Sequence, residues 1–250
     1  MAFNVLLSRA KTTKYDLVKV HKEVMDIFNK TSDLTQKNFQ QSCLGKASSF
    51  TSISLETDNQ YLQRWFAPQA LRELLGYRQL IETEGYEYHN LLKIILSRAA
   101  RSARLTTHFD LDFPKNPQTE PYWCYKHSRI CQPTTEALKF LKRYSVDTIK
   151  RIEEFSVRRT NAMAIACHTD SRKTSPPLID GVITSPPYVG LIDYHEQHAY
   201  AYHLLGLEDK REQEIGAATN GSSQKARRQY QENIAEVFLN ALDSMPQATA

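Results

Sequence analysis

The sequence predicts an α/β fold in which a mainly helical part, residues 1–160, precedes a smaller part, residues 161–250, that contains strands. Two observations predict this division. Apolar residues recur every three or four positions over most of the first part, which indicates helices that bury one face. The second part contains two short apolar runs, residues 162–167 and 182–183, and short β-branched runs are typical of buried strands.

Five segments have the apolar spacing of amphipathic helices. They are residues 16–30, 68–81, 88–105, 136–159 and 229–245. Residues 31–60 are rich in Ser, Thr, Gln and Asn and predict a loop, and residues 106–135 are irregular and rich in aromatic side chains.

Composition limits the classes of protein to which the chain can belong. With 250 residues, 41% of them hydrophobic, it can build a core, and its net charge of +4 is compatible with a nucleic-acid partner. No apolar run is long enough to span a membrane and no secretory signal opens the chain. The four irregularly placed cysteines favour a reducing, cytoplasmic location.

The stretch from Val182 to Tyr188 carries the most specific chemical signal in the chain. Pro186 and Pro187 must end the apolar run, because proline has no backbone N–H to give to a sheet and restricts the residue before it. The result is a rigid turn at the carboxyl end of a predicted strand, bearing the hydroxyl of Ser185. In open α/β sheets, ligands bind at that edge.

The side chains of this turn suit chemistry on the exocyclic amine of a nucleobase. Such an amine is a weak nucleophile because its lone pair is delocalised into the ring. Acceptors that hold its N–H groups out of the plane restore its reactivity, and the Ser185 oxygen and the Pro186 carbonyl are predicted acceptors. Tyr188 offers a flat face on which an extruded base can stack.

Thr184-Ser185-Pro186-Pro187-Tyr188 resembles motif IV of the S-adenosylmethionine-dependent DNA amino-methyltransferases. The Ser form of that motif is typical of cytosine-N4 enzymes, whereas Asp is commoner in adenine-N6 enzymes. The resemblance implies a partial Rossmann-like class I methyltransferase sheet with a large helical insertion, double-stranded DNA as the partner, and a restriction-modification system as the context. It assigns catalytic roles to Ser185, Pro186, Pro187 and Tyr188.

Cofactor contacts follow only from the resemblance. Residues 168–172 resemble the acidic strand end that these enzymes place one strand earlier, which implies that Asp170 and Thr184 contact S-adenosylmethionine. A Gly-rich motif that should precede these strands occurs nowhere in the chain. We therefore expect a middle piece of a methyltransferase. It is either one half of a split enzyme, which a complementing subunit carrying the Gly-rich motif would complete, or the product of a disrupted gene, or a truncated gene model.

A second Ser-Pro-Pro provides an internal control. Ser175-Pro176-Pro177 follows a polar segment instead of an apolar run, and Leu178 stands where an aromatic ring would be needed. This copy is predicted to be a loop without a catalytic role.

Basic residues suggest where nucleic acid binds. Arg98, Arg101 and Arg104 recur every three residues on a predicted helix and form either a phosphate-binding ridge or an ordinary solvated face. Lys126 and Arg129 lie among aromatic residues, a combination that suits an extruded base or a single strand.

No metal site is predicted. Cys124, His127 and Cys131 have a spacing that zinc could use, but no fourth ligand is obvious nearby, and an ordinary folded loop is favoured. His195 and His198 are one residue too close for the zinc-protease motif, so a polar helix or a DNA-facing loop is favoured there.

Two other functions remain open. The chain could belong to a methyltransferase of RNA base amines, although Ser185 argues against it. It could also be a non-catalytic nucleic-acid-binding protein, which the missing Gly-rich motif supports.

Overall fold

The computed structural model describes residues 1–44, 55–106, 116–124, 127–174, 177–188, 193–217 and 220–246, with side chains described only to residue 36 in the first range. Contacts divide the chain into two units. The helical unit comprises Leu6–Ile165 and Ala199–Leu207, and the motif unit comprises Met1–Val5, Ala166–His198 and Glu208–Ala250. The predicted domain boundary at residue 160 stays a prediction, since these units are defined by contacts alone.

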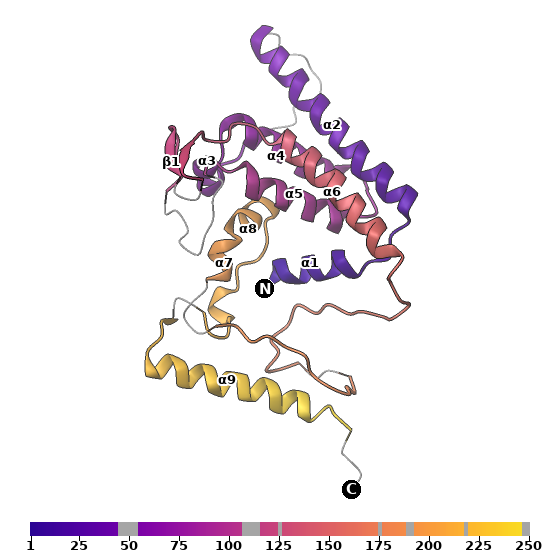
Figure 1. Ribbon diagram of the computed structural model, residues 1–250, viewed down its shortest axis with the longest axis vertical. Coiled ribbons are helices and arrows are strands. Elements are labelled where there is room, and N and C mark those ends of the chain that lie inside the picture. The colour runs from indigo at the N-terminus through magenta and orange to yellow at the C-terminus, as the bar shows by residue number, and fades with distance from the viewer. Residues whose placement is uncertain are drawn as a thin grey trace. The chain divides into compact units, whose positions relative to one another are not determined.

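Four helices form the body of the helical unit, and each contacts two of the others (Figure 1). They are α2 (Leu17–Leu44), α4 (Pro68–Thr83), α5 (His89–Ala103) and α6 (Leu138–Ser156). Their shared core contains the buried side chains of Val24, Ile27, Leu74, Leu92, Ile95 and Leu141. The helices predicted for residues 16–30, 68–81, 88–105 and 136–159 are thereby confirmed, because their apolar stripes face one another.

Shorter helices complete this unit. Helix α3 (Gln60–Trp65) contacts α8 (Ala199–Leu205), which also packs on α5. Helix α1 (Ala2–Thr12) begins in the motif unit and ends in the helical unit. The side chain of Asn59 accepts the N–H of Leu62 at 3.1 Å and so caps α3.

Helix α2 is longer than predicted, because residues 31–44 continue the helix instead of forming a loop. Thr31 and Thr35 are buried, and each hydroxyl donates to the carbonyl one turn earlier, at 2.7 Å and 3.0 Å. A threonine hydroxyl that donates to this carbonyl has its hydrogen bond inside the helix, so a buried threonine does not require the helix to end. The polar composition therefore predicted the wrong structure up to residue 44.

Glu73 of α4 fixes the start of α6. Its side chain is 2% exposed, and its carboxylate accepts the backbone N–H groups of Ala137 and of Leu138, the latter at 2.9 Å. The first N–H groups of a helix have no partner within the helix, and a negative charge is favoured at that end. Ala137 occupies the cap position and has no side-chain acceptor, so a residue 64 positions earlier provides it.

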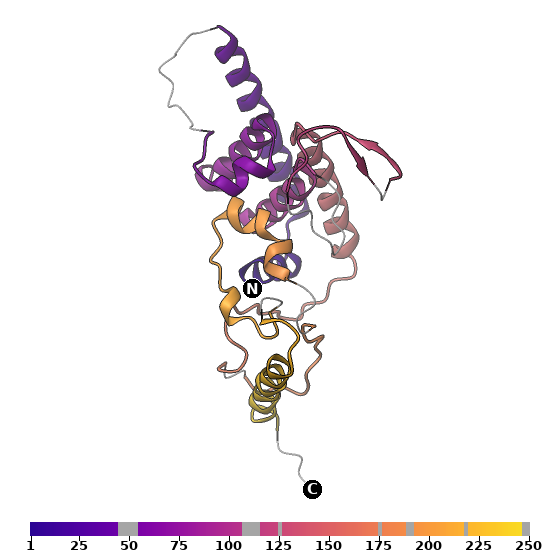
Figure 2. The ribbon, with the colours of Figure 1, turned by 90° about the vertical axis from the view of Figure 1, so that its left-hand side faces the viewer.

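A β-hairpin lies within the region predicted to be irregular. Strands β1 (Tyr122–Cys124) and β2 (Arg129–Cys131) pair antiparallel, with Trp123 opposite Ile130. Figure 2 shows this hairpin projecting from the helices of its unit.

The motif unit contains α7 (Tyr194–Gln197), a 3-10 helix η1 (Arg211–Gln213) and α9 (Gln224–Leu242). The two strands predicted at residues 162–167 and 182–183 are wrong: both segments are irregular, and Ile183 is fully exposed. A strand requires a neighbour that accepts and donates its backbone hydrogen bonds, and the described residues provide none beside these segments. The partial Rossmann-like sheet thus remains a prediction.

Among the described residues, no helix combines the length and the apolar composition that crossing a bilayer requires.

Candidate functional site

The predicted catalytic turn lies on the surface of the motif unit. Ser185 is exposed, Pro186 and Pro187 are half-buried, and the ring of Tyr188 is 58% exposed. Thr184, the predicted cofactor contact beside them, is also exposed. The hydroxyl, the proline backbone and the aromatic ring are therefore all accessible to a ligand, while Ser175 and Pro176 of the second Ser-Pro-Pro lie outside the described residues.

Asp170, the other predicted cofactor contact, is engaged within its own loop. Arg172 donates to both of its carboxylate oxygens, with Nε 3.0 Å from Oδ1 and Nη2 2.8 Å from Oδ2. These hydrogen bonds lower the pKa of Asp170. Arg172 also donates to Asn233 of α9 at 3.0 Å, and Asn240 of α9 donates to the Ser171 carbonyl at 3.0 Å. Arg172 and Asn240 therefore tie this loop to α9, and Asp170 holds the guanidinium of Arg172.

The motif unit leaves many apolar side chains exposed, both in the segment that contains this turn and in α9. The residues concerned are Leu178, Val182, Ile183, Tyr188, Phe238, Leu239 and Leu242. No residue of α9 is buried, although its pattern predicts one apolar face. A folded unit does not normally expose this much apolar surface unless another element covers it.

His195 does not belong to a metal site among the described residues. It is 2% exposed in α7, and its Nε2 lies 3.2 Å from Oδ1 of Asp209. Asp193 caps the same helix by accepting the N–H of Glu196 at 2.8 Å. The polar helix predicted here is confirmed, and its histidine is a buried structural residue.

Arg98 and Arg101 of α5 and Arg104, which follows that helix, do not form one ridge. Arg98 pairs with Asp147 of α6, Nη2 lying 2.5 Å from Oδ2, and its guanidinium covers the Tyr144 ring. Arg101 is exposed. Arg104 is fully buried, because α5 ends at residue 103 and the chain turns its side chain inward against Tyr200. The predicted ridge is therefore wrong for Arg104, and Arg98 is partly neutralised.

The remaining two predicted nucleic-acid residues fall in the hairpin region. Arg129 is exposed on β2, opposite Cys124 in the ladder. Lys126 lies outside the described residues.

The helical unit contains a cavity of about 720 Å³ between α1, α5 and α6. Its floor is apolar and includes Leu91 and Ile94 of α5 and Phe155 of α6, whose ring is 52% exposed. This volume is within the range of sites that hold a small ligand or a nucleotide.

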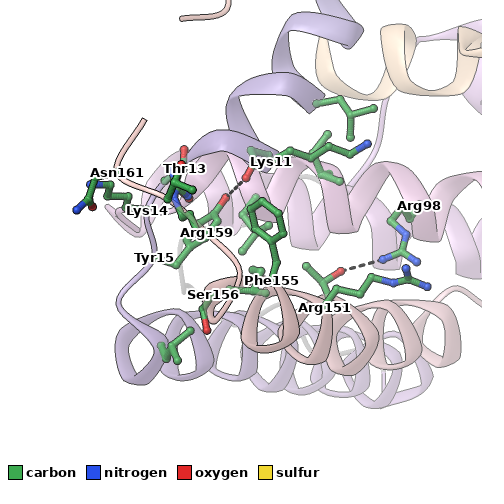
Figure 3. Close-up of a pocket in the computed structure, with 18 residues that line it drawn as sticks. Lys11, Thr13, Lys14, Tyr15, Arg98, Arg151, Phe155, Ser156, Arg159 and Asn161 are labelled. Atoms are coloured by element: carbon green, nitrogen blue, oxygen red, sulfur yellow. Dashed lines mark hydrogen bonds between the residues drawn. The ribbon is translucent and has the colours of Figure 1, made fainter. Parts of the chain in front are cut away.

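Five cationic side chains line this cavity: Lys11, Lys14, Arg98, Arg151 and Arg159. Figure 3 shows the ring of Phe155 between Arg159 on one side and Arg98 and Arg151 on the other. Asp147 accepts hydrogen bonds from both Arg151 and Arg98, which lower its pKa. Arg159 donates to the Thr12 and Thr13 carbonyls at the end of α1. The cavity is therefore lined by both apolar and positively charged side chains.

Sequence reasoning missed this cavity as a site. Arg151 and Arg159 are recognisable as outward basic residues of a helix, but Lys11 and Lys14 are about 140 positions away in the sequence. No local pattern brings them together, and only the packing of α1 beside α6 does so.

The chain has a relative among known proteins. A type II methyltransferase, M.MjaII of Methanocaldococcus jannaschii, is 35% identical over 306 aligned residues, which cover 95% of this chain. The chain is similar to a type II methyltransferase. This chain spans 58% of the length of that relative. The alignment is longer than the 250 residues of this chain, so the relative has residues at positions where this chain has none. No family model and no solved structure matches the chain.

Proposed function

We propose that this chain is part of an S-adenosylmethionine-dependent DNA methyltransferase that modifies an exocyclic amine, with cytosine N4 preferred over adenine N6. The observation that carries the proposal is the similarity of 95% of the chain to a type II methyltransferase. The preference for cytosine rests on Ser185, the first residue of the Ser-Pro-Pro-Tyr turn.

The proposed roles of this turn follow from its accessibility. The Ser185 oxygen and the Pro186 carbonyl would accept the N–H groups of the target amine and direct its lone pair at the methyl donor. Pro187 would fix the turn, and the exposed Tyr188 ring would stack on an extruded base. Extrusion is needed because the reacting atom cannot be reached inside a duplex.

The described residues do not form a cofactor site by themselves. Asp170 is held by Arg172, Thr184 is exposed, and the sequence contains no Gly-rich turn. We propose that polypeptide outside this sequence, either a complementing subunit or another segment of the same protein, supplies that turn and covers the exposed apolar residues of the motif unit. Asp170 and Thr184 would contact S-adenosylmethionine only in that assembly, which the 58% coverage of the relative supports.

The proposed DNA-binding surface lies on the helical unit. Lys11 and Lys14 at the cavity, together with the exposed Arg101 and Arg129, carry charge that can meet phosphates. Arg98, which lines the cavity, would also bind phosphate, and it pairs with Asp147 as well. Arg104 is kept as a structural residue, because a fully buried guanidinium cannot reach a phosphate.

One alternative has support of its own. If this chain acts alone, the engaged Asp170 and the absence of the Gly-rich turn favour a nucleic-acid-binding protein without catalysis.

The experiment combines this chain with a polypeptide that carries the Gly-rich motif, duplex DNA and S-adenosylmethionine with an isotopically labelled methyl group. Mass spectrometry of the product nucleosides should give labelled N4-methylcytosine. Labelled N6-methyladenine would overturn the choice of base and keep the reaction class. Methylation of RNA but not of DNA would overturn the proposed substrate.

A further inference from the structure

The β-hairpin places two cysteines on one face of its ladder. Cys124 lies opposite Arg129, and Cys131 lies two residues beyond Arg129 on the same strand. Because side chains alternate along a strand, residues two apart point to the same side, so both thiols project from the same face. The N–H of His127 donates to the Cys124 carbonyl at 3.2 Å, which holds the turn that begins at His127 close to the end of β1.

This turn brings the imidazole of His127 to the two thiols. The ligand atoms of Cys124, His127 and Cys131 all lie within 4.8 Å of one another, and His127 Nδ1 is 3.3 Å from Cys131 Sγ. A tetrahedral zinc ion, with Zn–S near 2.3 Å and Zn–N near 2.0 Å, separates its ligand atoms by about 3.5–3.8 Å. Small rotations about the side-chain bonds would therefore give zinc geometry without moving the backbone.

We propose that Cys124, His127 and Cys131 bind a zinc ion. Two thiolates and one imidazole select zinc over hard cations such as magnesium and calcium. The fourth tetrahedral position would hold a water molecule or another exchangeable ligand. The spacing of these residues in the sequence favours an ordinary folded loop. Their positions in the structure favour a zinc site instead.

The hairpin itself gives a physical reason for such an ion. A two-stranded hairpin is only marginally stable by itself in water. On the face opposite the thiols, the cross-strand pair of Trp123 and Ile130 is 54% and 64% exposed, so it buries little apolar surface. Metal binding would supply the missing stability, because ligation free energy contributes directly to folding.

Metal content gives the first test. The whole chain, purified with zinc and under reducing conditions, should hold one zinc per chain, and binding should release protons from the two thiols. Substitution with cobalt(II) should produce cobalt–thiolate charge-transfer absorption and tetrahedral d–d bands, and added imidazole should shift these bands through the fourth position. A chain that folds without zinc and gives no cobalt–thiolate absorption would overturn the proposal.

Variants make the test specific to these residues. Cys131→Ser and His127→Ala replace ligands that are not fully buried. Each should weaken zinc binding by more than about 100-fold, because loss of a residue that only hydrogen-bonds to a metal ligand already costs about 10- to 100-fold in affinity. Cys167→Ser is the matched control, because Cys167 is exposed and lies outside the cluster. Equal losses in all three variants would overturn the proposal, as would a Cys124–Cys131 disulfide found by mass spectrometry of unreduced peptides from the zinc-treated chain. Circular dichroism confirms that each variant is folded.

Discussion

The guanidinium of Arg104 lies over the ring of Tyr200, with its central carbon 4.7 Å from the ring centre. This contact joins the residue after α5 to α8, although the two positions are almost 100 residues apart in the sequence. Burial lowers the pKa of Arg104 to about 10, which leaves the guanidinium charged at neutral pH. The contact is therefore a buried cation–π pair within the helical unit.

Arg104→Gln should lower the free energy of unfolding by about 2 kcal/mol or more, because it removes a desolvated cation–π contact and buried side-chain stem. Arg101→Gln, at the exposed neighbour, should change it by no more than about 0.5 kcal/mol. Urea denaturation measures both values. Equal effects of the two substitutions would contradict the distinction between a structural and a surface arginine.

Glu73→Gln should also destabilise the helical unit, by about 1–3 kcal/mol, because an amide oxygen is a weaker acceptor than a carboxylate for the N–H groups of Ala137 and Leu138. The matched control is Glu82→Gln on the same helix, where the exposed carboxylate pairs with Arg78 at 2.9 Å. If both variants unfold at the same urea concentration, Glu73 does not cap α6.

Substitution of both Lys11 and Lys14 by Gln should weaken duplex binding and reduce its salt dependence. Each phosphate contact contributes about 0.9 to the slope of log affinity against log salt, so the slope should fall by about two. Substitution of both Lys22 and Lys142, which are exposed but do not line the cavity, is the control. Fluorescence anisotropy at several salt concentrations gives both slopes. Identical slopes would remove the cavity from the DNA-binding surface.

His195 should make the stability of the motif unit depend on pH. Burial lowers its pKa below the ordinary value of 6.5, against the attraction of Asp209. The unfolded chain therefore binds a proton more readily than the folded chain, and the free energy of unfolding should fall as the pH drops below about 6.5. His195→Gln should flatten this dependence, and His21→Gln, at an exposed histidine, should not. Thermal unfolding midpoints across this pH range are the measurement, and greater stability at low pH would contradict the prediction.

Periodicity predicted the helices of the helical unit because the apolar stripes of α2, α4, α5 and α6 meet one another, whereas the apolar stripe of α9 meets none among the described residues. Val24 and Leu92, for example, are buried where their spacing places them. Strand prediction failed at Ile183 for the converse reason, since a strand depends on a neighbour that the described residues do not provide. Phe155 belongs to the apolar stripe of α6 but lines the cavity instead of the core, a distinction that depends on where α1 packs.

The candidate site shows the same limit of sequence reasoning. The Ser-Pro-Pro-Tyr turn could be proposed from the sequence because its chemistry is local to four consecutive residues. The cluster of Cys124, His127 and Cys131 was visible as a spacing, but only the ladder register shows that its thiols share a face. The convergence of Lys14 and Arg159 at one cavity has no signal in the sequence, because it depends entirely on tertiary packing.

The most direct test of the proposed methyl transfer compares two serines in the reconstituted enzyme. Ser185→Ala removes an acceptor for the amine proton and should reduce the rate of methyl transfer to duplex DNA about 100-fold, which corresponds to about 3 kcal/mol. Ser175→Ala, in the second Ser-Pro-Pro, should leave the rate unchanged. Loss of activity in Ser175→Ala, with activity retained in Ser185→Ala, would contradict the assignment of the catalytic turn.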